Sequence, residues 1–101
     1  MISNKRIPDS INQWNIEYDP YGFSKEETWL EAAELTEDIL QLQHIYADGP
    51  VLDVGWYNGI YRAVVVMDKD WENPIETFES TSINKITAAL YLWLSKYENG
   101  A

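Results

Sequence analysis

Residues 51–67, VLDVGWYNGIYRAVVVM, carry the strongest structural signal in the sequence. Two β-rich apolar segments flank Asn58-Gly59, which is the strongest short-range signal for a two-residue type I′ hairpin turn, because both central residues of that turn need positive φ angles. The turn also sets the register of the strands. Tyr57 is expected to pair with Ile60, and the pairing continues outward from there. The stretch therefore predicts a hairpin over residues 51–67.

This register gives the predicted hairpin two different faces. One face is wholly apolar and must be covered by the rest of the chain: Leu52, Val54, Trp56, Tyr61, Ala63, Val65 and Met67. The other face is also too apolar for a sheet surface in water, and places Asp53 diagonal to Arg62 and within its reach: Val51, Asp53, Tyr57, Ile60, Arg62, Val64 and Val66. Either the N-terminal segment with Trp14 covers this second face, or the face contacts another chain.

A helix is predicted before the hairpin, over residues 24–47. Ser24 and Glu27 have the spacing of a capping box, and Asp48-Gly49-Pro50 ends the helical pattern. Helical spacing at 100° per residue gathers a broad apolar face: Trp29, Ala32, Leu35, Ile39, Leu40, Leu42 and Tyr46.

The remaining segments complete an α+β fold. Residues 75–79 alternate as an edge strand, and residues 83–97 form an amphipathic helix that Ser80-Thr81-Ser82 can cap. Residues 14–18 alternate as a short strand, although a helical turn beginning at Pro8 is the alternative. We predict two layers: an antiparallel sheet, made of the hairpin 51–67 and the edge strand 75–79, packed against the helices 24–47 and 83–97.

Composition limits the class of protein. The chain has 101 residues, of which 46% are hydrophobic and none is cysteine, so we expect a single folded domain over 1–101 without disulfides or thiolate chemistry. The N-terminal stretch lacks the apolar run of a secretory signal, and no stretch is long enough to span a membrane. We therefore expect a cytoplasmic protein that does not bind membranes.

No motif indicates catalysis, a cofactor or a metal. Asp68, Asp70 and Glu72 have the spacing D-x-D-x-E, but the sixth position of a calcium loop would fall on Asn73 instead of glycine. His44 is the only histidine, has no triad partners nearby, and is expected near a helix end. We predict that the protein is not an enzyme.

Charge points to a protein partner. The formal net charge is −10, from 17 acidic and 7 basic residues, which disfavours nucleic-acid binding and favours fast association with a basic protein. Helical spacing over 24–47 gathers an acidic strip, and a second acidic group surrounds Trp71, which is either an interface anchor or a lid over the core. The predicted partner-binding residues are Glu27, Glu31, Glu34, Asp38, Asp68, Asp70, Trp71 and Glu72.

The segment GWYNGIYRAVVVMDKDWENPIETF, followed by SINKITAALYLWL, resembles the hairpin, edge strand and helix that end some immunity proteins of bacterial contact-dependent growth inhibition systems. The resemblance covers the C-terminal half. It implies a non-enzymatic inhibitor that binds one cognate toxin domain, commonly a nuclease with a basic cleft. We expect the free chain to be a monomer or a weak homodimer. The alternative is a structural or regulatory subunit that homodimerises through the hairpin face.

Overall fold

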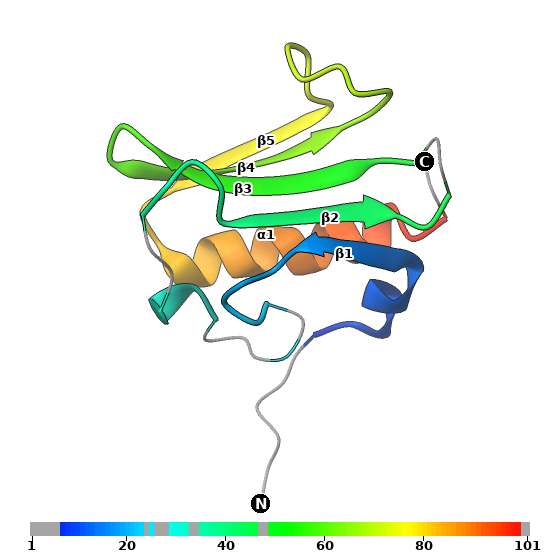
Figure 1. The fold of residues 1–101 in the computed structure, drawn as a ribbon, viewed down its shortest axis with the longest axis horizontal. Coiled ribbons are helices and arrows are strands. Elements are labelled where there is room, and N and C mark those ends of the chain that lie inside the picture. Colours follow the sequence, from blue (N-terminus) through cyan, green and yellow to red (C-terminus); the bar gives the residue numbers. More distant parts are fainter. Residues whose placement is uncertain (1–6, 24, 26–28, 33–34, 47–48, 100–101) are drawn as a thin grey trace, which may run out of the picture.

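The computed structural model describes residues 7–23, 25, 29–32, 35–46 and 49–99, and these residues form an α+β fold (Figure 1). Within them, five antiparallel strands form one sheet in the order β1-β2-β3-β4-β5. The elements along the chain are the 3-10 helix η1 (Asp9–Gln13), β1 (Trp14–Tyr18), the 3-10 helix η2 (Trp29–Ala32), β2 (Leu40–His44), β3 (Val51–Tyr57), β4 (Ile60–Val66), β5 (Glu76–Ser80) and the helix α1 (Ile83–Lys96).

The predicted hairpin is confirmed as β3 and β4. Tyr57 pairs with Ile60, and the register continues without a shift to the pair Val51 and Val66. Both turn residues have positive φ, 52° at Asn58 and 86° at Gly59, as a type I′ turn requires. The turn chemistry alone therefore placed every pair of this hairpin correctly.

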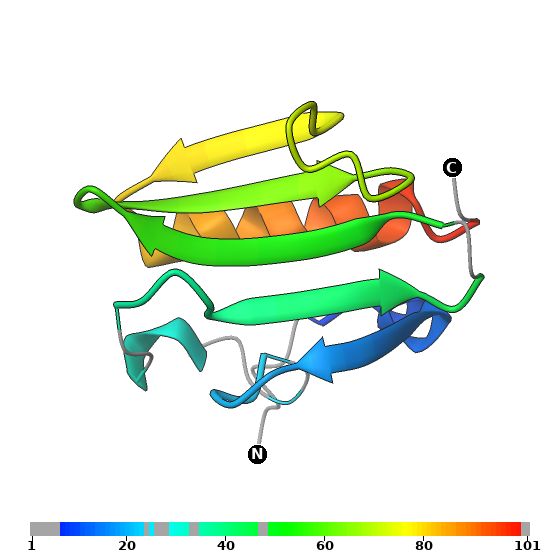
Figure 2. The ribbon, with the colours of Figure 1, turned by 45° about the horizontal axis from the view of Figure 1, so that its top comes forward.

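The helix α1 covers one face of the sheet (Figure 2). It packs against β4, β5 and η1, and the Ser82 side chain caps it by accepting a hydrogen bond from the backbone N–H of Lys85, so the predicted helix over 83–97 is confirmed to within one residue. The core between the two layers contains most of the predicted apolar face of the hairpin. Its buried residues are Trp14, Phe23, Trp29, Leu30, Ile39, Leu40, Leu42, Leu52, Val54, Tyr61, Ala63, Val65, Ile86, Leu90, Trp93, Leu94 and Tyr97.

The prediction of a helix over 24–47 is wrong. Residues 29–32 form only the short η2, and residues 40–44 form β2, which lies between β1 and β3. In β2, Leu40, Leu42 and His44 are buried and alternate with half-buried Gln41 and Gln43, which is the period of a strand. The free edge of β3 needs hydrogen-bond partners, and pairing with it outweighed the local helical pattern. The predicted capping box at residues 24–27 falls largely outside the described residues.

The N-terminal segment contains both of the alternatives that its sequence allows, a helical turn and a strand. η1 supplies the helical turn, and β1 follows it at the edge of the sheet. Trp14 faces the core, where its Nε1–H donates a hydrogen bond of 3.4 Å to the carbonyl oxygen of Leu94. Trp14 itself therefore does not cover the second face of the hairpin, which was one of the two alternatives left open by the sequence.

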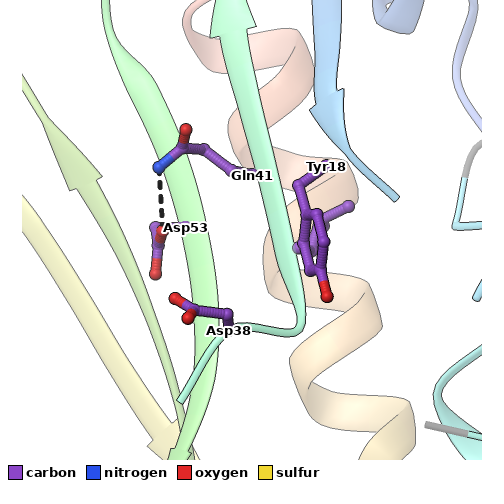
Figure 3. Close-up of a pocket in the computed structure, with 5 residues that line it drawn as sticks. Tyr18, Asp38, Gln41 and Asp53 are labelled. Atoms are coloured by element: carbon purple, nitrogen blue, oxygen red, sulfur yellow. Dashed lines mark hydrogen bonds between the residues drawn. The ribbon is translucent and has the colours of Figure 1, made fainter. Parts of the chain in front are cut away.

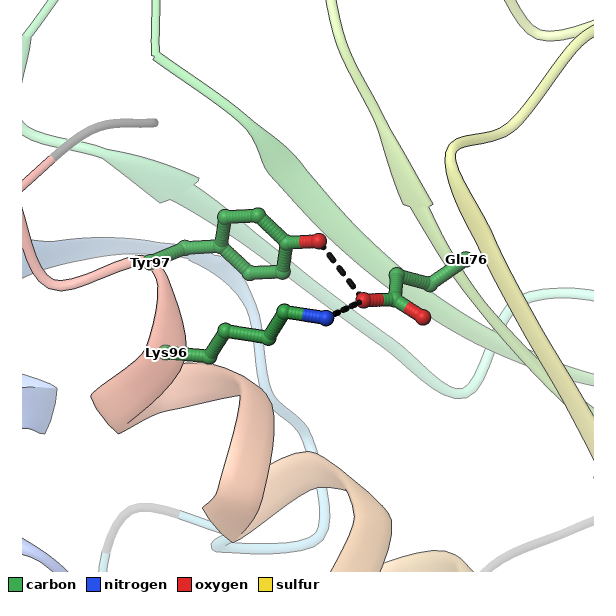
Figure 4. Close-up of polar contacts among 3 residues, drawn as sticks. All are labelled: Glu76, Lys96 and Tyr97. Carbon is green, nitrogen blue, oxygen red and sulfur yellow. Dashed lines mark hydrogen bonds and ion pairs between the residues drawn. The ribbon is translucent and has the colours of Figure 1, made fainter.

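The predicted edge strand over 75–79 is β5, shifted by one residue. Its first residue, Glu76, accepts hydrogen bonds from Lys96 Nζ and, at 2.6 Å, from the hydroxyl of Tyr97 (Figure 4). The ammonium of Lys96, and to a smaller degree the hydroxyl of Tyr97, lower the pKa of Glu76. These contacts tie the edge of the sheet to the end of α1.

Candidate functional site

The outer face is the face of the sheet opposite α1. Because paired residues in a sheet point to the same side, the register places one row of side chains across this face: Tyr18, Gln41, Asp53, Val64 and Thr77. α1 and the core residues of η2 lie on the other side, and in the described part of the chain no helix lies over the outer face (Figure 2). Val51 and Val66, at one end of this face, are buried, and the rest of the outer face is the candidate binding surface.

Tyr18 reaches the outer face through a bulge in β1. Ile16 pairs with Leu42, but Tyr18 pairs with Gln41, so Glu17 is an extra residue between the two pairs. A bulge of this kind reverses the alternation of the strand and redirects the next side chain. Tyr18 therefore lies beside Gln41 on the outer face, and the prediction that residues 14, 16 and 18 share one face is wrong for Tyr18.

A first hollow of about 270 Å³ opens on this face. Tyr18 stands on one side of it, the carboxylates of Asp38 and Asp53 stand on the other, and Gln41 lies at one end (Figure 3). The Gln41 side-chain amide donates a hydrogen bond of 3.2 Å to Asp53 Oδ2. This contact fixes the orientation of the Asp53 carboxylate, while leaving most of its four hydrogen-bond acceptor positions unused.

The charged form of Asp53 is disfavoured in the folded protein. The pKa of Asp53 is raised from its ordinary value of 3.8 to about 6. Partial burial is the main cause, the hydrogen bond from Gln41 opposes it, and the nearby charge of Asp38 adds a smaller increase. Near neutral pH, Asp53 is thus mostly ionised but carries an unrelieved desolvation cost. A cation placed in the first hollow would relieve that cost.

A second hollow, of about 220 Å³, shares Asp53 with the first one. It is lined by Asp53, Tyr57, Arg62, Val64 and Trp71. Burial, followed by the charge of Asp53, raises the pKa of Tyr57. Arg62 and Asp53, predicted to lie within reach of each other, both line this hollow. Arg62 Nε lies 3.9 Å from a carboxylate oxygen of Glu79, whereas Asp53 accepts its hydrogen bond from Gln41.

Trp71 lies on the loop between β4 and β5. Positive φ angles at Asp68 (55°) and Lys69 (59°) bend this loop, and the side chain of Asn73 donates hydrogen bonds to both carboxylate oxygens of Asp70. Trp71 is 48% exposed and lines the second hollow. Its interpretation as a lid over the core is therefore wrong, because it lies on the side of the sheet away from α1.

The predicted binding residues are only partly brought together. Asp38 and Trp71 line the two hollows, and Asp68, Asp70 and Glu72 are exposed on the Trp71 loop. Glu31 is exposed on η2 and does not line either hollow. Glu27 and Glu34 lie outside the described residues. Since the helix over 24–47 is not formed, its helical spacing no longer supports an acidic strip.

The sequence reasoning missed the three polar or aromatic residues that line the first hollow together with Asp38: Tyr18, Gln41 and Asp53. Asp53 was placed on the correct face but was not assigned a role. The polar alternation of Gln41 and Gln43 within ILQLQHI was the signal that could have found β2 and, through it, the partner of Asp53.

His44 has a structural role at the end of β2, not at a helix end. Its side chain is buried, its Nε2–H donates a hydrogen bond of 2.8 Å to the carbonyl oxygen of Glu98, and its Nδ1 accepts one of 3.1 Å from the backbone N–H of Tyr46. Both ring nitrogens are occupied by backbone groups. In the described part of the chain, no three or more His, Cys, Asp or Glu side chains gather where they could hold a metal ion.

The chain is thus an α+β protein in which carboxylates and aromatic rings line two small hollows on the sheet face opposite α1. No protein family model, curated protein or solved structure matches the chain. Among the described residues, no helix has both the length and the apolar character needed to cross a membrane.

Proposed function

We propose that this chain is an immunity protein that binds a cognate toxin domain and neutralises it by occlusion, without catalysing a reaction. The open outer face carries the proposal, because it combines exposed aromatic rings with carboxylates around two hollows. The partner is a toxin domain with a basic cleft, such as that of a nuclease, and the two proteins meet in the cytoplasm.

The aromatic side chains supply the anchors of the proposed interface. Trp71 is 48% exposed and Tyr18 is 46% exposed, and each lines one of the two hollows that share Asp53. Tyrosine and tryptophan are enriched among the few residues that carry most binding energy, particularly where neighbouring groups exclude water. The two hollows provide space in which side chains of the partner can insert next to these anchors.

The carboxylates would attract a basic partner electrostatically and so speed up its association. The exposed loop residues Asp68, Asp70 and Glu72 surround Trp71, and the whole chain has a formal net charge of −10. A field of this sign accelerates association with a basic surface and makes the rate strongly dependent on salt. The same carboxylates would pair with the lysine and arginine side chains that a nuclease uses to hold phosphates.

The test uses the C-terminal domain of the protein encoded next to this chain in its genome. Co-expression of the chain should restore the growth of cells that produce this domain, and the purified proteins should associate at a rate that falls steeply between low and high salt. Trp71→Ala should weaken the complex at least about tenfold. Growth arrest that the chain does not relieve, or association that salt does not change, would contradict the proposal.

Light scattering tests the alternative of a homodimer. The free chain should be a monomer at both low and high salt, because the outer face is proposed to serve a different protein. An apolar homodimer that forms through Ile60 and Val64, which are half-buried on the outer face, would instead persist in high salt. That result would favour a structural or regulatory subunit over an inhibitor.

A further inference from the structure

We infer that the first hollow is a socket for one arginine side chain of the protein partner, with the guanidinium held between the ring of Tyr18 and the carboxylates of Asp53 and Asp38. The identity of the partner as a basic protein rests on the proposed function. The socket itself is argued from the shape and chemistry of the hollow.

The size of the first hollow favours a single side chain. Pockets for cofactors and drug-sized ligands usually enclose about 300–1,000 Å³, and the first hollow has about 270 Å³. Its lining residues come from β1, β2, β3 and the segment before β2 (Figure 3). A long side chain that projects from the surface of another protein can enter such a hollow.

The walls of the first hollow match a guanidinium group. Asp53 and Asp38 offer carboxylate oxygens on one side, and the Gln41 amide holds Asp53 by its hydrogen bond of 3.2 Å. Tyr18 offers an aromatic ring on the opposite side (Figure 3). A planar cation can pair with carboxylates along its edge and stack its face on a ring at the same time.

Arginine fits these walls better than lysine. The guanidinium has five N–H donors in a rigid fork, so it can engage the carboxylates of Asp53 and Asp38 together. It is also more weakly hydrated than an ammonium, which lowers the cost of entering a partly buried site. A lysine ammonium is a point charge and makes no comparable stacking contact.

The second hollow does not suit the same ligand. Arg62 contributes to its wall, and a second guanidinium there would meet a like charge. Asp53 is shared by both hollows, so the position of Arg62 restricts the cation to the side of Tyr18 and Asp38. The two hollows therefore differ in the class of side chain that they accept.

The experiment titrates the whole protein with N-acetyl-arginine methylamide and follows amide signals by NMR. The side-chain amide of Gln41 and the backbone amides of Tyr18 and Asp53 should shift in a saturable manner, with a dissociation constant on the order of millimolar. The citrulline derivative, which has the same shape without the charge, should not shift them. The lysine derivative should bind at least about threefold more weakly.

Two variants and one control identify the socket. Asp53→Asn should weaken binding of the arginine derivative at least about tenfold, and Tyr18→Leu should weaken it about threefold and reduce the preference over lysine. The control Asp9→Asn makes the same chemical change at an exposed position in η1 and should leave the dissociation constant unchanged.

Equal shifts with the arginine and citrulline derivatives, equal affinities for arginine and lysine, or binding that survives Asp53→Asn would each overturn the socket. The titration needs no partner protein, so it separates the two proposals. Loss of the arginine signal with an intact, salt-dependent toxin complex would remove the socket alone. Arginine binding without any complex with the toxin domain would remove the proposed function alone.

Discussion

Asp53→Asn is expected to stabilise the protein at neutral pH. Asp53 is partly buried beside Asp38, and its pKa is raised from 3.8 to about 6 by burial first and by the charge of Asp38 second. The ionised carboxylate therefore costs free energy in the folded state that it does not cost in the unfolded chain. Asparagine has almost the same shape and can keep the hydrogen bond with Gln41, but it has no charge to desolvate.

The magnitude and the pH window follow from the shift. A raised pKa of about 2 units corresponds to roughly 3 kcal/mol at 1.36 kcal/mol per unit, and solvent screening of this partly exposed group reduces the effect to about 1–2 kcal/mol. Between pH 4 and pH 6 the folded protein binds more protons than the unfolded chain, so its free energy of unfolding falls as the pH rises. The cost is complete above pH 6 and absent below pH 4.

Urea unfolding, followed by tryptophan fluorescence, measures this difference. At pH 7.5 the Asp53→Asn variant should exceed the wild type by about 1–2 kcal/mol in the free energy of unfolding, and at pH 4 the two proteins should agree. The control Asp9→Asn should show no such pH-dependent gap. A variant that is less stable than the wild type at pH 7.5, or a gap of equal size at both pH values, would contradict a stability cost from the Asp53 charge.

Three further substitutions test the fold and the interface. His44→Phe should lower the free energy of unfolding by about 1–3 kcal/mol in urea titrations, because the two backbone groups that its ring nitrogens bind lose a partner; Gln43→Ala, on the other face of β2, is the control. Gly55→Ala should cost more than about 3 kcal/mol or prevent folding, as judged by circular dichroism, because the added Cβ would lie 2.3 Å from the carbonyl oxygen of Glu37. Trp71→Ala should change stability by less than about 0.5 kcal/mol while weakening the toxin complex, and a large loss of stability would instead assign Trp71 to the fold.

The elements that the sequence predicts correctly are those set by local chemistry. Asn58-Gly59 defines both the turn and the register of the hairpin, and the Ser82 cap with its following apolar stripe defines α1. β2 was missed because the apolar residues between 29 and 42 also fit a helical period. Residues 40–44 form a strand because they pair with the edge of β3. This pairing joins residues that are distant in the sequence, so a local sequence pattern does not predict it.

The candidate site depends on the same non-local pairing. Trp71 could be identified from the sequence as an aromatic ring in acidic surroundings, whereas Asp38 was selected by the spacing of a helix that is not formed. Gln41 joins the site only when β2 pairs with β3, and Tyr18 joins it only through the bulge in β1. A bulge is a property of the pairing between two strands, so the alternation of residues 14–18 by itself predicts the wrong face for Tyr18.

The two faces of the sheet differ in polarity and exposure, and this difference is the strongest physical argument for a binding role of the outer face. On the inner face, residues such as Leu52, Val54 and Ala63 are fully buried and apolar, as a stable core requires. The outer face keeps a carboxylate whose burial costs stability, at Asp53, and leaves a large ring half exposed, at Trp71. Departures of this kind persist in proteins mainly where function needs them, since simple substitutions could remove both. A partner that inserts a cation beside Asp53 and covers Trp71 would offset both costs on binding.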